Sequence, residues 1–140
     1  VAPRYEVYHG AIGRPVLVGK QDSRMMEALE AAIHAEKTCA QNMVPGVEGR
    51  LAEAKARKIM EAAGYGESFL YSGIHSVGVI EFEPPIFGPS QAELIGAGMV
   101  LSIDIPVFNT PWGGFKIENG YYITENGSEP LTNIDYIIQK

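Results

Sequence analysis

The chain has 140 residues, which suits one domain that buries about two-thirds of its unfolded surface. Hydrophobic residues make up 46% of it and charged residues 20%, a composition typical of a globular domain that argues against a disordered chain. The net charge of -6 is spread along the chain without a basic cluster, so we expect no nucleic-acid partner.

The segment YEVYHGAIGRPVLVG, residues 5–19, is rich in aromatic and β-branched residues. It is broken at Gly10 and Gly13, which predicts one or two bent strands. The residues at the beginning of the sequence lack the basic-then-apolar order of a signal peptide, and no apolar run is long enough to cross a bilayer. We therefore expect a cytoplasmic domain without a membrane partner.

From Asp22 or Ser23 to Met43, apolar residues recur at helical spacing. Either polar residue can cap the N-terminus, so we predict an amphipathic helix that ends before Pro45. Cys39, the only cysteine, lies within this helix. A single cysteine excludes an internal disulfide and a thiolate metal cluster, and it indicates a reducing compartment.

A second helix is predicted from about Val47 to a C-terminal stop at Gly64. Small apolar residues along one face of this helix predict close packing. They are Ala52, Ala56, Ile59 and Ala63. After Gly64 the chain is rich in glycine, proline and β-branched residues, which predicts a sheet with long loops. The order of elements indicates an α+β fold, with residues 1–140 forming a single domain.

Two alternating strands, MVLSIDIPVF and GFKIENGYYIT, are predicted to form a hairpin through the loop NTPWGG. The final segment, NIDYIIQK, suits either a short helix or a strand. If the hairpin is centred on Pro111, Asp104 and Glu118 lie opposite each other on one face. Such a pair is destabilising unless a cation lies between the carboxylates or they share a proton. In the alternative register, offset by one residue, one acid points to solvent or pairs with Lys116.

The segment SGIHSVGVIEFEPPIFGPS, residues 72–90, places His75 in a glycine-bounded turn. An imidazole combined with the two carboxylates suits a divalent ion such as manganese, cobalt, iron or zinc. From the residues alone, a single histidine in such a loop is as typical of a hydrogen-bonded structural residue as of a ligand.

Taken together, GIHSVGVIEFEPP, GAGMVLSIDIPVF and WGGFKIENGYYITENGSEPLT resemble the catalytic domain of the pita-bread metallopeptidases. This family includes aminopeptidase P, prolidase, methionine aminopeptidase and the metal-free relative creatinase. The resemblance spans about Tyr8 to Thr132 and implies a pita-bread fold. In the family, five side chains hold two metal ions, and the resemblance implies three of these ligands in this chain. They are His75, Asp104, where the family usually has glutamate, and Glu118.

The sequence also departs from the family pattern. Ala11 stands where the family has its second aspartate, and the first aspartate would fall just before Val1. Phe82 replaces a second histidine near the substrate carbonyl, whereas Glu83 is retained and is expected to act as a proton shuttle or behind the metal ligands. The resemblance therefore implies a reduced metal site, with one ion or none. It also predicts a domain lacking its N-terminal strand, completed by a homodimer or by association with a chain that supplies the missing strand.

Three functions are compatible with this resemblance. The first is an Xaa-Pro peptidase-like hydrolase that uses a metal to cleave a C–N bond of a peptide or small amide. The second is a metal-free, creatinase-like hydrolase of a small nitrogen compound, with His75 as acid–base catalyst. The third is a pseudoenzyme that binds peptides or proteins without catalysis, which Ala11 and Phe82 favour.

Overall fold

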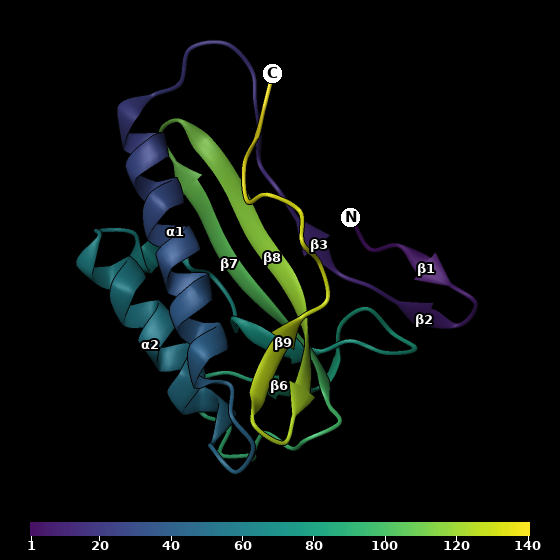
Figure 1. Ribbon diagram of the computed structural model, residues 1–140. Coiled ribbons are helices and arrows are strands. Elements are labelled where there is room, and N and C mark those ends of the chain that lie inside the picture. Colours follow the sequence, from purple (N-terminus) through teal and green to yellow (C-terminus); the bar gives the residue numbers. More distant parts are fainter.

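Two long helices pack on the same side of the long hairpin of a six-stranded sheet (Figure 1). This computed structural model describes all residues, Val1 to Lys140. The elements are β1 (Arg4–Tyr5), β2 (Tyr8–His9), β3 (Ile12–Gly13), β4 (Val16–Leu17), α1 (Ser23–Asn42), α2 (Gly49–Ala62), the 3-10 turn η1 (Gly66–Ser68), β5 (Ile74–Ser76), β6 (Glu83–Phe87), β7 (Val100–Thr110), β8 (Gly113–Thr124), β9 (Gly127–Pro130) and β10 (Ile138–Gln139). The predicted α+β fold is confirmed.

Both predicted helices are present. The Asp22 side chain caps α1 by accepting a hydrogen bond from the Arg24 backbone N–H at 2.8 Å. Helix α2 begins at Gly49, two residues later than predicted. Beyond its end, Gly64 has φ 84°, a conformation that glycine adopts without strain.

The packed face of α2 differs slightly from the predicted stripe of small residues. Ala52 and Ala56 are buried as expected, but Met60 takes the third buried position and Ala63 is exposed. The reason is the end of the helix: positions 52, 56 and 60 follow one face of α2, whereas Ala63 is the C-cap residue beyond its last helical residue, Ala62.

The sheet has the strand order β3-β8-β7-β5-β6, with β9 paired to the free part of β8. Strands β7 and β8 form the predicted hairpin, and Asp104 pairs directly with Glu118. The ladder becomes irregular between Val107 and Thr110, next to the Pro-Trp turn. The register centred on Pro111 is therefore the observed one, and the register offset by one residue is wrong.

The two faces of the hairpin differ in chemistry. Odd-numbered residues of β7 face the helices and, together with residues of α1 and α2, belong to a buried apolar cluster of 22 residues. On β7 these are Leu101, Ile103, Ile105 and Val107. Even-numbered residues, among them Ser102 and Asp104, are also buried but lie on the opposite face. The polar face is the one that carries the candidate site.

The N-terminus lies beside β3, far from α2 (Figure 1). The β1–β2 ribbon projects from the sheet, and the β2 residue His9 donates its backbone N–H to the Gly78 carbonyl at 2.8 Å. The C-terminal segment forms the strand β10, which pairs in parallel with β4. None of the helices combines the length and the apolar character needed to cross a membrane.

Candidate functional site

Three adjacent strands bring His75, Asp104 and Glu118 together. His75 on β5 pairs with Ser102 on β7, and Asp104 on β7 pairs with Glu118 on β8. Directly paired residues point to the same face of a sheet, so all three side chains lie on the face opposite the helices. Their exposed fractions are 0%, 3% and 2%. The sequence had grouped these three residues, and the fold places them in one buried cluster.

The tautomer of His75 follows from its surroundings. Its Nδ1 lies 2.9 Å from the Ser76 carbonyl oxygen, which can only accept a hydrogen bond. Nδ1 therefore carries a proton, and in the neutral ring Nε2 keeps a free lone pair. Nε2 is buried without a hydrogen-bond partner and lies 3.6 Å from Asp104 Oδ1. This nitrogen is available to bind a cation or to accept a proton.

Lys116 lies between the two facing carboxylates. Its Nζ is 3.3 Å from Asp104 Oδ2 and 3.0 Å from Glu118 Oε2. Ser102 Oγ donates to Asp104 Oδ1 at 3.1 Å, so both Asp104 oxygens have partners. Glu118 Oε1, in contrast, is buried and unpartnered. A pair with Lys116 was predicted only for the offset register, whereas the lysine bridges both acids in the observed register.

The pKa values of the two facing acids are shifted in opposite directions. Burial, and then the neighbouring Asp104 charge, raise the pKa of Glu118 to about 7. Burial also opposes ionisation of Asp104, but His75 and the Lys116 charge outweigh it and lower the pKa of Asp104. For His75, burial would lower the pKa, and the Asp104 carboxylate raises it on balance. Asp104 is thus the fixed anion, and Glu118 holds an exchangeable proton near neutral pH.

The loop 78–83 covers the cluster from the side. The Phe82 ring lies 4.3 Å from the His75 ring, centroid to centroid, at a tilt of 37°. Glu83, predicted as a catalytic residue, directs Oε2 to the Ile80 backbone N–H at 2.8 Å. Its carboxylate closes the loop, and Glu83 is not one of the three clustered side chains.

Ala11 leaves one side of the site without a ligand. Gly13 on β3 pairs with Glu118, so Ala11, two residues earlier, lies on the same face of the sheet. It is buried, with 6% of its surface exposed, and offers no oxygen or nitrogen from its side chain. The acid expected at this position in the pita-bread pattern has no local substitute on β3.

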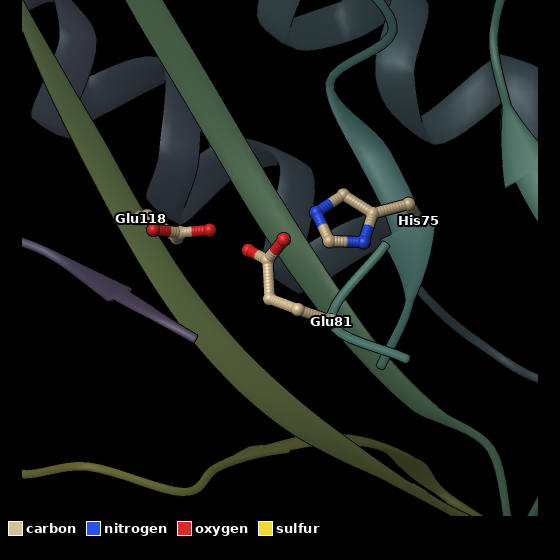
Figure 2. Close-up of side chains that lie close together, drawn as sticks. All are labelled: His75, Glu81 and Glu118. Atoms are coloured by element: carbon tan, nitrogen blue, oxygen red, sulfur yellow. The ribbon is translucent and has the colours of Figure 1, made fainter. Parts of the chain in front are cut away.

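A third acid lies close to the unpartnered atoms. His75, Glu81 and Glu118 each offer one ligand atom, and these atoms lie within 4.8 Å of one another. In Figure 2 the Glu81 carboxylate lies between the His75 ring and the Glu118 carboxylate. Glu81 could not be assigned a role from the sequence, because an acid in an irregular loop has no periodicity that shows where its side chain points.

These residues fit one divalent cation and do not fit two. One imidazole nitrogen together with carboxylate oxygens suits manganese, cobalt, iron or zinc. Two of these atoms, His75 Nε2 and Glu118 Oε1, are buried without a hydrogen-bond partner. A second ion would need the acid that Ala11 lacks, and it would meet the Lys116 ammonium beside Asp104 and Glu118.

Comparison with known proteins gave a consistent set of matches. The model of metallopeptidase family M24 matches residues 1–125. The Xaa-Pro dipeptidase of Pyrococcus furiosus is 30% identical over 131 residues, which cover 94% of this chain and 38% of that protein. The Xaa-Pro dipeptidase of Pyrococcus horikoshii is 31% identical, with 94% and 37% covered. The chain thus spans less than two fifths of the length of these curated relatives.

Solved structures agree with the sequence matches. The prolidase from Pyrococcus furiosus superposes with a TM-score of 0.91 at 30% identity, covering 96% of this chain and 40% of that one. The X-Pro aminopeptidase from Thermotoga maritima gives a TM-score of 0.93 at 25% identity, covering 99% and 40%. The predicted pita-bread fold is confirmed over nearly the whole chain.

Proposed function

Because the chain belongs to metallopeptidase family M24, we propose that it hydrolyses a C–N bond of a peptide or small amide, as an Xaa-Pro peptidase-like hydrolase with a reduced metal site. One observation carries the proposal: His75 Nε2 on β5 and Glu118 Oε1 on β8, on either side of β7, are both buried without hydrogen-bond partners. Buried polar atoms are rarely left unpaired, so two of them in one cluster indicate a missing ligand.

In this proposal His75 and Glu118 hold a single manganese, cobalt, iron or zinc ion. When bound, the ion would polarise the scissile carbonyl and lower the pKa of a water molecule. Asp104, which the family pattern implies as a third ligand, stands beside His75 and keeps Lys116 in place. Glu83 acts as a positioning residue through its hydrogen bond to the loop, and Phe82 shields the His75 ring from solvent.

The test combines metal content with hydrolysis. Protein purified without added metal is analysed for transition metals and assayed on Xaa-Pro dipeptides and small amides with and without added Mn²⁺ or Co²⁺. We expect up to one ion per chain, hydrolysis that depends on it, and loss of both in His75→Ala. An absence of both metal and hydrolysis in a folded protein would contradict the proposal and leave the peptide-binding pseudoenzyme.

A metal-free hydrolase is the second candidate, because Lys116 already supplies a positive charge between Asp104 and Glu118. His75 would then act as the acid–base group through Nε2, which its Nδ1 bond to Ser76 leaves free. Hydrolysis of a small nitrogen compound that persists in excess chelator, and that His75→Ala abolishes, would establish this candidate over the metal-dependent one.

A further inference from the structure

Glu81 directs its carboxylate into the space between His75 and Glu118 (Figure 2). We propose that His75, Glu81 and Glu118 are the protein ligands of the single cation, and that Asp104 lies outside the ligand set. This inference rests on the proposed function, because it concerns the metal of the same site. It replaces a strand residue of the family pattern with an acid from the loop 78–83.

These three residues are the ones whose nitrogen or oxygen atoms have no partner within the cluster. Asp104 accepts a hydrogen bond from Ser102 on one oxygen and faces the Lys116 ammonium with the other. The ion pairs of the cluster join His75 or Lys116 to Asp104 or Glu118, and none of them takes up Glu81. The unoccupied donor atoms are therefore His75 Nε2, Glu118 Oε1 and the Glu81 carboxylate.

The distances suit one ion after a small closure. Ligand atoms about 2.0–2.2 Å from a metal are at most about 4.4 Å from each other. The three atoms lie within 4.8 Å of one another, so shifts of a few tenths of an ångström complete the site. One imidazole and two carboxylates balance the charge of a divalent ion, and three protein ligands leave an open position for water or substrate.

Charge also favours Glu81 as a ligand. The Lys116 ammonium lies 3.3 Å from Asp104 Oδ2 and 3.0 Å from Glu118 Oε2, so it offsets charge on both strand acids. Glu118 still offers Oε1, which has no partner, whereas both Asp104 oxygens have partners. The Glu81 carboxylate lies between His75 and Glu118 (Figure 2), and no cation pairs with it.

The loop that carries Glu81 is held at both of its ends. The Gly78 backbone carbonyl accepts from the His9 N–H at 2.8 Å, and the Gly78 N–H donates to the Ile80 carbonyl at 3.1 Å. Glu83 Oε2 accepts from the Ile80 N–H at 2.8 Å. A loop fixed in this way lowers the entropy lost when Glu81 binds an ion.

The test is a titration of the metal-free protein with Co²⁺, followed by visible absorption and by calorimetry. Four proteins are compared: the wild type, Glu81→Gln, Asp104→Asn and Glu125→Gln. Glu125→Gln is the matched control, because it removes the same charge from an exposed position in the turn between β8 and β9. Far-UV circular dichroism and thermal unfolding verify that each variant is folded.

We expect Glu81→Gln to weaken Co²⁺ binding by about tenfold or more and to change the absorption spectrum, since the ion loses a ligand. Asp104→Asn and Glu125→Gln should stay within about threefold of the wild type. Co²⁺ binding that survives in Glu81→Gln but is lost in Asp104→Asn would overturn this inference and leave the metal-dependent function standing. A wild type that does not bind Co²⁺ would overturn both.

Discussion

At the scale of single residues, Lys116 separates the two facing acids of the cluster. Cross-strand pairing forces Asp104 and Glu118 to face each other, and two buried carboxylates at that distance repel. The ammonium 3.3 Å from one and 3.0 Å from the other relieves the repulsion from within the chain. The cluster can therefore fold without metal, and it retains donor atoms for only one further cation.

Replacing Lys116 with methionine should expose this repulsion. The lysine side chain is 30% exposed, so we expect the loss in unfolding free energy to be about 1–3 kcal/mol, less than for a fully buried pair. Urea unfolding in chelator measures the loss, and added Co²⁺ should recover a larger part of it in the variant than in the wild type. Lys58→Met on the exposed side of α2 is the control. Equal losses in both variants would argue against the charge mechanism.

Glu118 should make the stability of the metal-free protein depend on pH. Its pKa is raised by burial and by Asp104 from an ordinary 4.5 to about 7, so between these values the folded state holds more protons than the unfolded chain. Stability contributed by this proton is complete below pH 4.5 and is lost as the pH rises towards 7.

The pH effect is measured by urea unfolding in chelator across that range. We expect the unfolding free energy to fall with rising pH, at most by about 1.4 kcal/mol per unit for one proton. Glu118→Gln should flatten this fall. Asp104, with its lowered pKa, titrates below the range, whereas His75 and its raised pKa contribute only near the upper end. A slope unchanged in Glu118→Gln would assign the effect to another group.

At the scale of elements, Glu36 ties α1 to the hairpin from the helix side. Its Oε1 accepts from Asn119 Nδ2 at 2.9 Å and from the Tyr121 hydroxyl at 2.6 Å, and its Oε2 accepts from the Tyr136 hydroxyl at 2.5 Å. Burial and the Glu36 charge raise the pKa of Tyr121, which keeps its hydroxyl a donor. Asn119 follows Glu118 in the chain, so this contact also fixes the strand that carries the site.

Removing Glu36 should therefore be costly. Glu36→Ala leaves three donors without their acceptor in a buried position, and we expect it to lower the unfolding free energy by about 2–4 kcal/mol. Glu30→Ala on the exposed side of α1 is the matched control and should change it by less than about 0.5 kcal/mol. Chemical denaturation measures the unfolding free energy of both variants. If both lose similarly little, Glu36 contributes little to the packing of α1 on the sheet.

At the scale of the whole molecule, stability and the candidate chemistry occupy opposite faces of one sheet. The apolar cluster of 22 residues lies between the helices and the hairpin, whereas His75, Asp104 and Glu118 lie on the other face. The fold thus has a core that does not include the candidate metal ligands. Burial of apolar surface on the helix side supplies most of the stabilisation.

Removal of metal should consequently leave the fold intact. We expect protein treated with chelator to retain its far-UV circular dichroism and to unfold cooperatively, at a melting temperature lowered only by the linkage contribution of the lost ion. Thermal unfolding with and without Co²⁺ measures this shift. Loss of secondary structure on chelation would instead mean that the metal organises the sheet, as in small domains that fold on metal binding.

Local patterns were sufficient to predict the main elements. Asp22 caps the start of α1, and Gly64 adopts the positive φ that follows the end of α2. Both effects involve only residues close by in the chain, so they can be recognised in the sequence. Side chains alternate between the two faces of a strand, and the centre of a hairpin sets which residues of its strands pair. With the hairpin centred on Pro111, the pairing of Asp104 with Glu118 could therefore be predicted.

The sequence by itself therefore determined the two helices and the two strands of the hairpin, and it suggested the grouping of His75 with the facing acids while two registers stayed open. Only the tertiary structure decided between these registers, and only it showed that Lys116 bridges both acids, that His75 keeps Nε2 free and that Glu81 turns toward His75 and Glu118. These features depend on how a loop and a side chain pack against strands distant in the sequence. No sequence periodicity predicts such contacts, because they form only when the separate segments come together in the folded chain.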